Sequence, residues 1–276
     1  MGWINEQAPR SPMFDPLRVH GGALFDTAQP EWEDFERLLE GRESPVRVGS
    51  GRSLRIVQQA RAPRVFEERY EPRVYLRGEL QVRPGNWHDA FNVLAWLAFP
   101  AAKAALNARH YAALCAQRDA GTANRGPVQD ALTLFDESGV VVASNDAGLL
   151  DLLRTFRWKE LFWTHRERVR VHMRFWIFGH ALYEKALRPF VGMTGRAILL
   201  ETEAGFASSP PRQQLAIVDE RVAAHLSDPA NLATTRDLAI VPVLGVPGWW
   251  ADNERESFYD NRDYFRPGRL RENRGS

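Results

Sequence analysis

The sequence predicts an α+β fold: a single globular domain with short mixed or antiparallel strands, hairpins and several packed helices, preceded by an extended N-terminal arm. Helical spacing and strand-like alternation of apolar residues both occur, without the regular order of a doubly wound sheet. The 276 residues are 44% hydrophobic and 26% charged, which suits one sizeable core. No internal repeat or low-complexity segment divides the sequence.

The first third of the chain is expected to hold an arm, a helix and extended segments. Residues 1–29 contain several prolines and glycines with little periodicity, as in an extended arm. The stretch 30–42, PEWEDFERLLEGR, begins with proline, continues with acids and ends near glycine, which predicts a short amphipathic helix. The stretch 45–57 alternates around Gly-Ser-Gly and predicts a hairpin, and 73–83 is expected to be extended.

A strongly apolar tract, GNWHDAFNVLAWLAFPAAKAALNARH at 85–110, predicts two consecutive helices. Asn86 is placed to cap the first, and Pro100 separates the two because proline is tolerated only in a first helical turn. The expected helices run over about 87–98 and 101–118.

The next segment combines strand and helix signals. The stretch 130–144, DALTLFDESGVVVAS, has two β-rich runs around Glu-Ser-Gly and predicts a hairpin. Helices are expected over 145–156 and 158–168. The strict alternation of VRVHMRFWIF at 169–178 predicts a strand with one buried face and with arginines and His172 on the other.

The last part of the chain is expected to alternate short elements. A helix should follow Gly179 and end at Pro189, and 194–201 is expected to be a strand. Residues 210–228 have a proline start and helical spacing, and 237–245 reads as a last strand.

These elements predict an organisation in three parts. Residues 1–29 form the arm, 30–252 the single α+β domain, and 253–276 a C-terminal aromatic and basic packing tail. The N-terminus lacks the pattern of a signal peptide, and the tract at 91–106 is too short and polar to cross a bilayer, so a cytoplasmic protein without membrane association is expected.

Charge and cysteine content restrict the function classes. The formal net charge of +1 argues against a dedicated nucleic-acid binder. Cys115 is the only cysteine, which excludes an intrachain disulfide and a thiolate zinc cluster. The sequence contains no phosphate loop, H-E-x-x-H, G-x-S-x-G or CxxC pattern.

The candidate functional residues are polar groups within the apolar tract. Lys103, Asn107 and His110 are spaced by four and three residues, so they share one helix face. His88 and Asn92 repeat the pattern on the preceding helix. The two stripes either face each other and line a polar pocket or form the solvated sides of two amphipathic helices.

Two histidine–carboxylate pairs add further candidates. His88 and Asp89 lie at an expected helix start, where the helix dipole favours a carboxylate and a neutral imidazole. A neutral imidazole can act as a base or a metal ligand, whereas Asp89 can be a simple cap. His180 and Glu184 lie four apart on one helix face and can bind a metal or transfer protons, or form a surface hydrogen bond.

Two other charged segments each allow a functional and a structural interpretation. In RGPVQDALTLFDESG (125–139), Arg125 is a candidate substrate ligand, whereas Asp136 and Glu137 are attributed to turn geometry. The expected strand presents a basic edge made up of Arg168, Arg170, His172 and Arg174. That edge can attract a polyanion, but protection of an edge strand from aggregation is the favoured interpretation.

Four segments resemble a bacterial family known as a domain of unknown function, number 3025. They are NWHDAFNVLAWLAFPAAKAALNARH, RGPVQDALTLFDESG, FGHALYEKALRPF and GVPGWW, in order within about 66–266. The resemblance implies that these segments are shared features of the family, and it implies no activity.

The favoured hypothesis is a hydrolase-type enzyme with a His/Asp/Glu pocket acting on a small anionic substrate. Its catalytic candidates are His88, Asp89, His110, His180 and Glu184. Its substrate-binding candidates are Asn92, Lys103, Asn107 and Arg125. In a metal-assisted version His88, His110 and His180 bind a divalent metal, with Asp89 or Glu184 as base. In a metal-free version a histidine–carboxylate pair transfers protons while Lys103 binds the anion.

The alternative is a non-catalytic binding or scaffold protein that engages a protein or nucleic-acid partner. The same polar groups would then be caps and core hydrogen bonds. An exposed apolar patch near Trp249 and Trp250, without a polar cleft, would favour this alternative.

Overall fold

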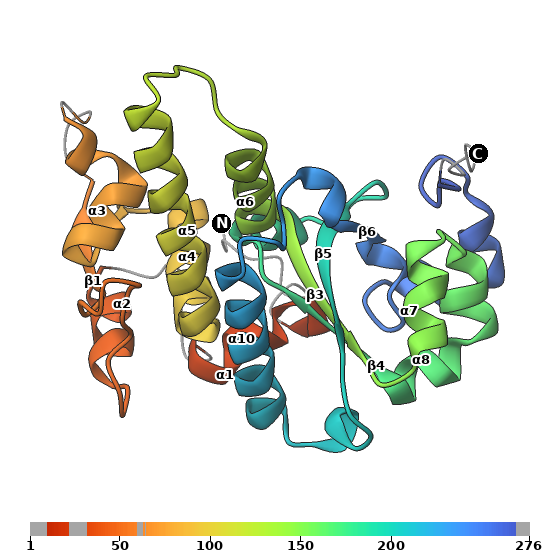
Figure 1. Ribbon diagram of the computed structural model, residues 1–276. Coiled ribbons are helices and arrows are strands. Elements are labelled where there is room, and N and C mark those ends of the chain that lie inside the picture. Colours follow the sequence, from red (N-terminus) through yellow and green to blue (C-terminus); the bar gives the residue numbers. More distant parts are fainter. Residues whose placement is uncertain (1–9, 22–31, 60–62, 64, 269–276) are drawn as a thin grey trace.

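A four-stranded mixed sheet forms the centre of the structure, which is a computed structural model (Figure 1). Its strands are β3 (Gly139–Ser144), β4 (Met173–Ile177), β5 (Thr194–Glu201) and β6 (Ala239–Pro242), in the order β4-β3-β5-β6. β3 pairs parallel with β5, and the two outer pairs are antiparallel. All six residues of β3 are buried, as expected of an apolar central strand covered on both faces.

The structure describes residues 10–21, 32–59, 63 and 65–268. A second, two-stranded parallel sheet pairs β1 (Arg55–Gln58) with β2 (Glu79–Val82). Together with the helices, the two small sheets confirm the predicted α+β class and the mixed pairing of short strands. Within the described ranges, no helix combines the length and apolar character needed to cross a membrane.

The two helices of the apolar tract are confirmed as α4 (Trp87–Ala98) and α5 (Pro100–Asp119). Asn86 caps α4, because its side-chain oxygen accepts a hydrogen bond from the Asp89 backbone N–H at 3.0 Å. The start of α5 is capped from another helix, α10 (Pro211–Ser227). There the Asp219 carboxylate accepts hydrogen bonds from the backbone N–H groups of Ala101 at 3.0 Å and Ala102 at 2.7 Å.

Helices lie on both sides of the large sheet (Figure 1). On the left in that view are α4, α5, α6 (Pro127–Ser138) and α10, and α9 (His180–Ala186) contacts both α4 and α6. On the right are α7 (Ala147–Arg154) and α8 (Arg166–His172), beside the C-terminal segment. The sequence-predicted helix over 158–168 is a π-helix, Glu160–Thr164, followed by the start of α8.

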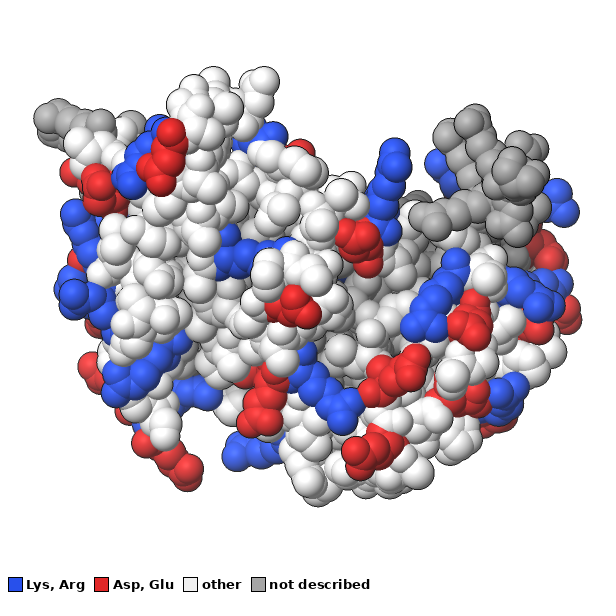
Figure 2. Space-filling view, in the orientation of Figure 1, with Lys and Arg blue, Asp and Glu red and all other residues white. Residues whose placement is uncertain are grey.

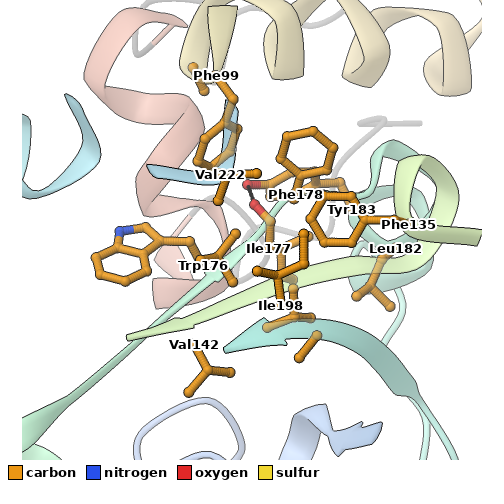
Figure 3. Packing of buried hydrophobic residues seen from close by; sticks show 14 of the residues in the cluster. Phe99, Phe135, Val142, Trp176, Ile177, Phe178, Leu182, Tyr183, Ile198 and Val222 are labelled. Atoms are coloured by element: carbon orange, nitrogen blue, oxygen red, sulfur yellow. Dashed lines mark hydrogen bonds between the residues drawn. The ribbon is translucent and has the colours of Figure 1, made fainter. Parts of the chain in front are cut away.

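Buried aromatic and aliphatic side chains pack the sheet against the neighbouring helices (Figure 3). Phe135 of α6 stacks on Phe178, which follows β4, with ring centroids 4.6 Å apart. Tyr183 of α9 donates a hydrogen bond from its hydroxyl to the carbonyl of Ile177 at 2.5 Å. The adjoining ends of α6 and α9 are therefore held on one rigid support.

Three expectations about local structure were wrong. The hairpin expected over 130–144 is instead the end of α6 followed directly by β3. The extended segment 73–83 begins as α3 (Tyr70–Arg77), and only 79–82 form a strand. The strand expected over 169–178 begins at Met173, because 169–172 complete α8 and leave Val171 57% exposed.

The N-terminal expectations are met in part. In the stretch 45–57, one antiparallel bridge joins Arg47 to Ser53 across a tight turn, and β1 begins at Arg55. The helix expected at 30–42 is α2 (Trp32–Glu40). Within the expected extended arm, Pro12–Phe14 form a 3₁₀ turn and Asp15–Gly21 form α1; residues 1–9 and 22–29 of the arm lie outside the described residues.

The elements of the last third follow the sequence closely. The predicted strand 194–201 is β5, and the predicted helix 210–228 is α10. The strand expected over 237–245 forms β6 and then a 3₁₀ turn, Val243–Gly245. After the turn the chain continues through further 3₁₀ turns, Ala251–Glu254 and Glu256–Asp260.

Candidate active site

A cavity of about 410 Å³ opens between α3, α4, α5, α6 and α9. The candidates that line it are His88, Asp89, Asn92, His110 and His180. Tyr70, Glu71, Asp136 and Glu137 also line it. The two polar stripes predicted on consecutive helices therefore contribute to one hollow, which supports the pocket interpretation over solvated helix faces.

His88 and His180 meet at the wall of this cavity. Their Nε2 atoms are 3.0 Å apart and their ring centroids 4.4 Å apart. The Nδ1 atom of His88 lies 3.2 Å from a Glu184 carboxylate oxygen, and Nδ1 of His180 lies 3.7 Å from one of Asp136. Each imidazole thus has a carboxylate on one side and the other imidazole on the opposite side.

His180 remains neutral at neutral pH. The residue is 5% exposed, and this burial lowers the pKa of its imidazole to about 4, although the nearby Asp136 carboxylate acts in the opposite direction. A neutral imidazole has one free lone pair, which can accept a proton or bind a metal. His180 is available for either role without first losing a proton.

Glu137 completes a group of three potential metal ligands. Its carboxylate lies 3.7 Å from Nε2 of His180, and one ligand atom each of His88, Glu137 and His180 lie within 4.8 Å of one another. Burial raises the pKa of Glu137, although His88 opposes this rise. His110 lines the same cavity but is not part of this group, which differs from the three-histidine set expected from the sequence.

A buried polar network lies behind the histidine pair. The Lys103 ammonium, 2% exposed, contacts the Asp136 carboxylate and donates a hydrogen bond to the Asn92 side-chain oxygen at 2.9 Å. Asn92 in turn donates to the Tyr70 hydroxyl at 2.6 Å. Burial alone would raise the pKa of Asp136, but Lys103 and then His180 hold it below its ordinary value.

A second cavity carboxylate, that of Glu71 on α3, is held by a side chain of α5. The Asn107 side-chain amide donates to the Glu71 backbone carbonyl at 3.1 Å and to its carboxylate at 2.5 Å. Burial raises the pKa of Glu71, and the neighbouring His110 opposes that rise. Asn107 therefore acts as a positioning residue for a cavity carboxylate and does not itself line the cavity.

Asp89, expected as a base, accepts hydrogen bonds from the Arg83 backbone N–H at 2.8 Å and from its guanidinium at 2.8 and 2.9 Å. These bonds hold both oxygens of the Asp89 carboxylate against Arg83, at the wall of the cavity. Glu184 does not line the cavity, but it contacts His88, which does. Arg125 is exposed and reaches the cavity only through its hydrogen bond to Thr133.

The two surface features expected of a binding protein are a free basic edge and an exposed apolar patch near Trp249, and the described residues show neither clearly. The arginines of the expected basic edge have acidic or backbone partners, such as Arg168 with Asp146 at 2.6 Å and Arg170 with Glu167 at 2.7 Å. Trp249 is 8% exposed and packs against Phe175. On the face in Figure 2, basic and acidic side chains are interspersed, without a continuous basic surface among the residues described there.

Tyr70, Glu71, Asp136 and Glu137 line the cavity but are not among the site candidates that the sequence indicates. Asp136 and Glu137 were assigned to a turn, but the spacing of the buried Ala131, Leu132 and Phe135 is helical and would have placed them in the last turn of α6. Tyr70 and Glu71 carry no comparable signal, because α3 is short and mostly polar.

Comparison with known proteins gives a family but no activity. A family model described as "Protein of unknown function (DUF3025)" matches residues 54–269, which include every cavity residue discussed above. Comparisons with curated proteins and with solved structures found no match.

Proposed function

Because the chain belongs to this family of unknown function, whose description names no activity, we propose a function from the site alone. The protein is a hydrolase-type enzyme that activates water with paired imidazole and carboxylate groups in the cavity. The observation that carries the proposal is the contact between His88 and His180, each with a carboxylate on its far side.

The electrostatics of the cavity support acid–base chemistry. Burial lowers the pKa of His180 to about 4, and it raises the pKa values of Glu71 and Glu137. Neighbouring groups whose pKa values are displaced in opposite directions are typical of sites that divide proton donation and acceptance. A simple structural network would not require several such groups around an open cavity.

The size of the cavity suits a small substrate, since about 410 Å³ lies within the usual range for small-molecule sites. Lys103, the expected ligand for an anionic group, is buried and bonded to Asp136 and Asn92. The described wall also carries five acidic residues and one arginine, Arg83. This charge balance favours a neutral substrate over an anionic one.

The proposal is tested with chromogenic esters of different charge. Purified protein is assayed with p-nitrophenyl acetate, p-nitrophenyl phosphate and bis-p-nitrophenyl phosphate, and we expect the neutral acetate ester to be turned over fastest. Loss of either imidazole, in His88→Ala or His180→Ala, should lower kcat/KM by roughly 10²- to 10⁴-fold, the usual contribution of a positioned acid–base group. His165→Ala, a histidine outside the cavity, serves as the control.

Equal rates in the wild type and in both cavity-histidine variants would show that the hydrolysis comes from elsewhere. An absence of turnover with every ester, and with a wider set of amides, would contradict the proposal.

A further inference from the structure

The facing imidazole nitrogens of His88 and His180 are arranged as two ligands of one cation would be. Nε2 of His88 and Nε2 of His180 are 3.0 Å apart, while both Nδ1 atoms are turned toward carboxylates. A carboxylate beside Nδ1 favours the N–H on that nitrogen, and a neutral ring has only one N–H. Both Nε2 atoms then direct lone pairs at each other.

A direct hydrogen bond between the rings is the less favourable arrangement. It would place the N–H of one ring on Nε2 and leave a lone pair on Nδ1. That lone pair would face Glu184 if His88 were the donor, or Asp136 if His180 were the donor. Lone pairs facing carboxylates repel, whereas a metal ion between the Nε2 atoms satisfies both rings at once.

Glu137 supplies a third donor at a suitable distance. In a tetrahedral zinc site with bonds near 2.0–2.1 Å, neighbouring donor atoms are about 3.3 Å apart. The distance between the two Nε2 atoms is 3.0 Å, and Nε2 of His180 is 3.7 Å from the Glu137 carboxylate. The ligand atoms of His88 and Glu137 also lie within 4.8 Å of each other, so side-chain adjustments alone would bring the three groups onto one ion.

The surroundings of the ligands also match a metal site. Metal-binding histidines commonly donate their second N–H to a carboxylate, which fixes the orientation of the ring. Glu184 is placed to do this for His88, and Asp136, itself held by Lys103, for His180. Nδ1 of His180 is buried and has no hydrogen-bond partner among the described residues. The Asp136 carboxylate, 3.7 Å away, therefore acts on this ring through its position and charge.

We infer that His88, His180 and Glu137 bind one first-row divalent cation, Zn²⁺ before others, with a remaining position open to water from the cavity. Two imidazoles and one carboxylate form a donor set of catalytic zinc, and they disfavour Mg²⁺ and Ca²⁺, which prefer oxygen ligands. The inference rests on the proposed hydrolase and names its cofactor. A bound Zn²⁺ would lower the pKa of its water toward neutrality.

The test uses the full chain, stripped with a chelator and then titrated with Zn²⁺ by calorimetry or against a competing metal indicator. We expect one equivalent of Zn²⁺ to bind. Glu184→Gln should weaken binding roughly 10-fold, as for an outer partner, and the ligand changes His180→Ala and Glu137→Gln should weaken it more than about 100-fold. Far-UV circular dichroism checks that each variant is folded.

Two histidine variants serve as matched controls. His110 lines the same cavity outside the ligand group, and His165 lies away from the cavity, so His110→Ala and His165→Ala should keep wild-type affinity. A stripped wild-type protein that takes up no Zn²⁺, or a loss of affinity in His110→Ala as large as in His180→Ala, overturns the inference.

The two proposals fail separately. One equivalent of Zn²⁺ bound with no hydrolysis of any ester leaves the metal site standing and removes the hydrolase. Hydrolysis that depends on His88 and His180 but survives complete metal removal leaves the hydrolase standing and removes the metal ion as its cofactor.

Discussion

Lys103 is a charged side chain in the protein interior, and its neighbours explain how it is tolerated. The Asp136 carboxylate and the Asn92 side-chain oxygen accept from its ammonium, which also lies 5.7 Å from the Trp96 ring centroid and 5.9 Å from that of Phe178. A buried ammonium without a carboxylate would carry a large desolvation cost. Lys103 therefore fixes Asp136, and Asp136 in turn faces His180.

Removal of one member of this pair should destabilise the protein strongly. Asp136→Asn leaves the Lys103 ammonium buried without its counter-charge, and we expect a loss of about 3–5 kcal/mol in the free energy of unfolding. Urea-induced unfolding at pH 7 provides the measurement. A loss below about 1 kcal/mol would mean that Lys103 does not depend on Asp136.

The matched control for Asp136→Asn is the double variant Lys103→Met/Asp136→Leu, which removes both charges and should be more stable than Asp136→Asn alone. The comparison has a defined pH dependence. Because the folded-state pKa of Asp136 lies below its ordinary 3.8, its stabilising effect is complete above that pH and is lost as the pH falls through the folded-state value. The stability of the wild type relative to the double variant should therefore fall on acidification below about pH 4.

At the scale of elements, two junctions bring the inferred metal ligands together. α6 passes into β3 at Gly139, and β4 passes into α9 through Gly179. The Gly139 carbonyl accepts hydrogen bonds from the N–H groups of Phe178 at 2.9 Å and Gly179 at 3.0 Å. A Cβ atom on Gly179 would lie 2.4 Å from the Gly139 nitrogen and 2.5 Å from the Glu137 carbonyl group. The missing side chain allows His180 to approach Glu137.

Gly179→Ala should therefore disturb both stability and the inferred metal site. The added methyl group would meet backbone atoms, which cannot move aside as a side-chain tip can, and we expect a loss of about 1–3 kcal/mol in unfolding free energy. Zn²⁺ affinity should fall as well, since His180 would be displaced from Glu137. Thermal unfolding and Zn²⁺ titration give the two values.

Gly126→Ala is the matched control for Gly179→Ala, because apart from the adjoining residues no described atom lies within 4 Å of the position that a Cβ would take at Gly126. This variant should unfold and bind Zn²⁺ like the wild type. If the two variants behaved alike, the close approach at Gly179 would not be what limits the site.

At the scale of the whole molecule, the described part of the C-terminal segment, residues 253–268, packs onto the rest of the domain. The Tyr264 hydroxyl donates to the Met193 carbonyl at 2.7 Å and accepts from the Leu244 backbone N–H at 2.9 Å. Asn253, which is fully buried, donates to two carbonyls and accepts from the buried Arg166. These bonds connect the chain end to α8 and to the turn after β6.

Deletion of the segment should unfold or greatly destabilise the protein. Truncation after Asp252 removes the buried Tyr259, Tyr264 and Phe265, each worth about 1.5–3 kcal/mol of apolar burial. We expect insoluble protein or a large fall in Tm. Truncation after Gly268, which removes none of the described residues, is the control and should leave Tm unchanged; similar values for both truncations would contradict this account.

Local sequence patterns were sufficient to predict an element wherever its formation depends mainly on residues within that element. The apolar spacing around Pro100 and the cap at Asn86 determined α4 and α5, and the apolar run at 194–201 determined β5. The polar stripe on α5 also indicated that Lys103, Asn107 and His110 share a face. Such features depend on neighbours within about one helical turn, so they can be read without a structure.

Only the tertiary structure decided that His180 lies against His88 and Glu137, residues 92 positions away in the first case and 43 in the second. The helix-to-strand junction at Gly139 resembles a hairpin turn in sequence, because its acids and glycine suit either structure, and packing of Phe135 on Phe178 selected the helix. The histidines and several of the carboxylates could thus be identified from the sequence. Their assembly into one site follows from strand pairing and core packing between distant segments, which no local pattern encodes.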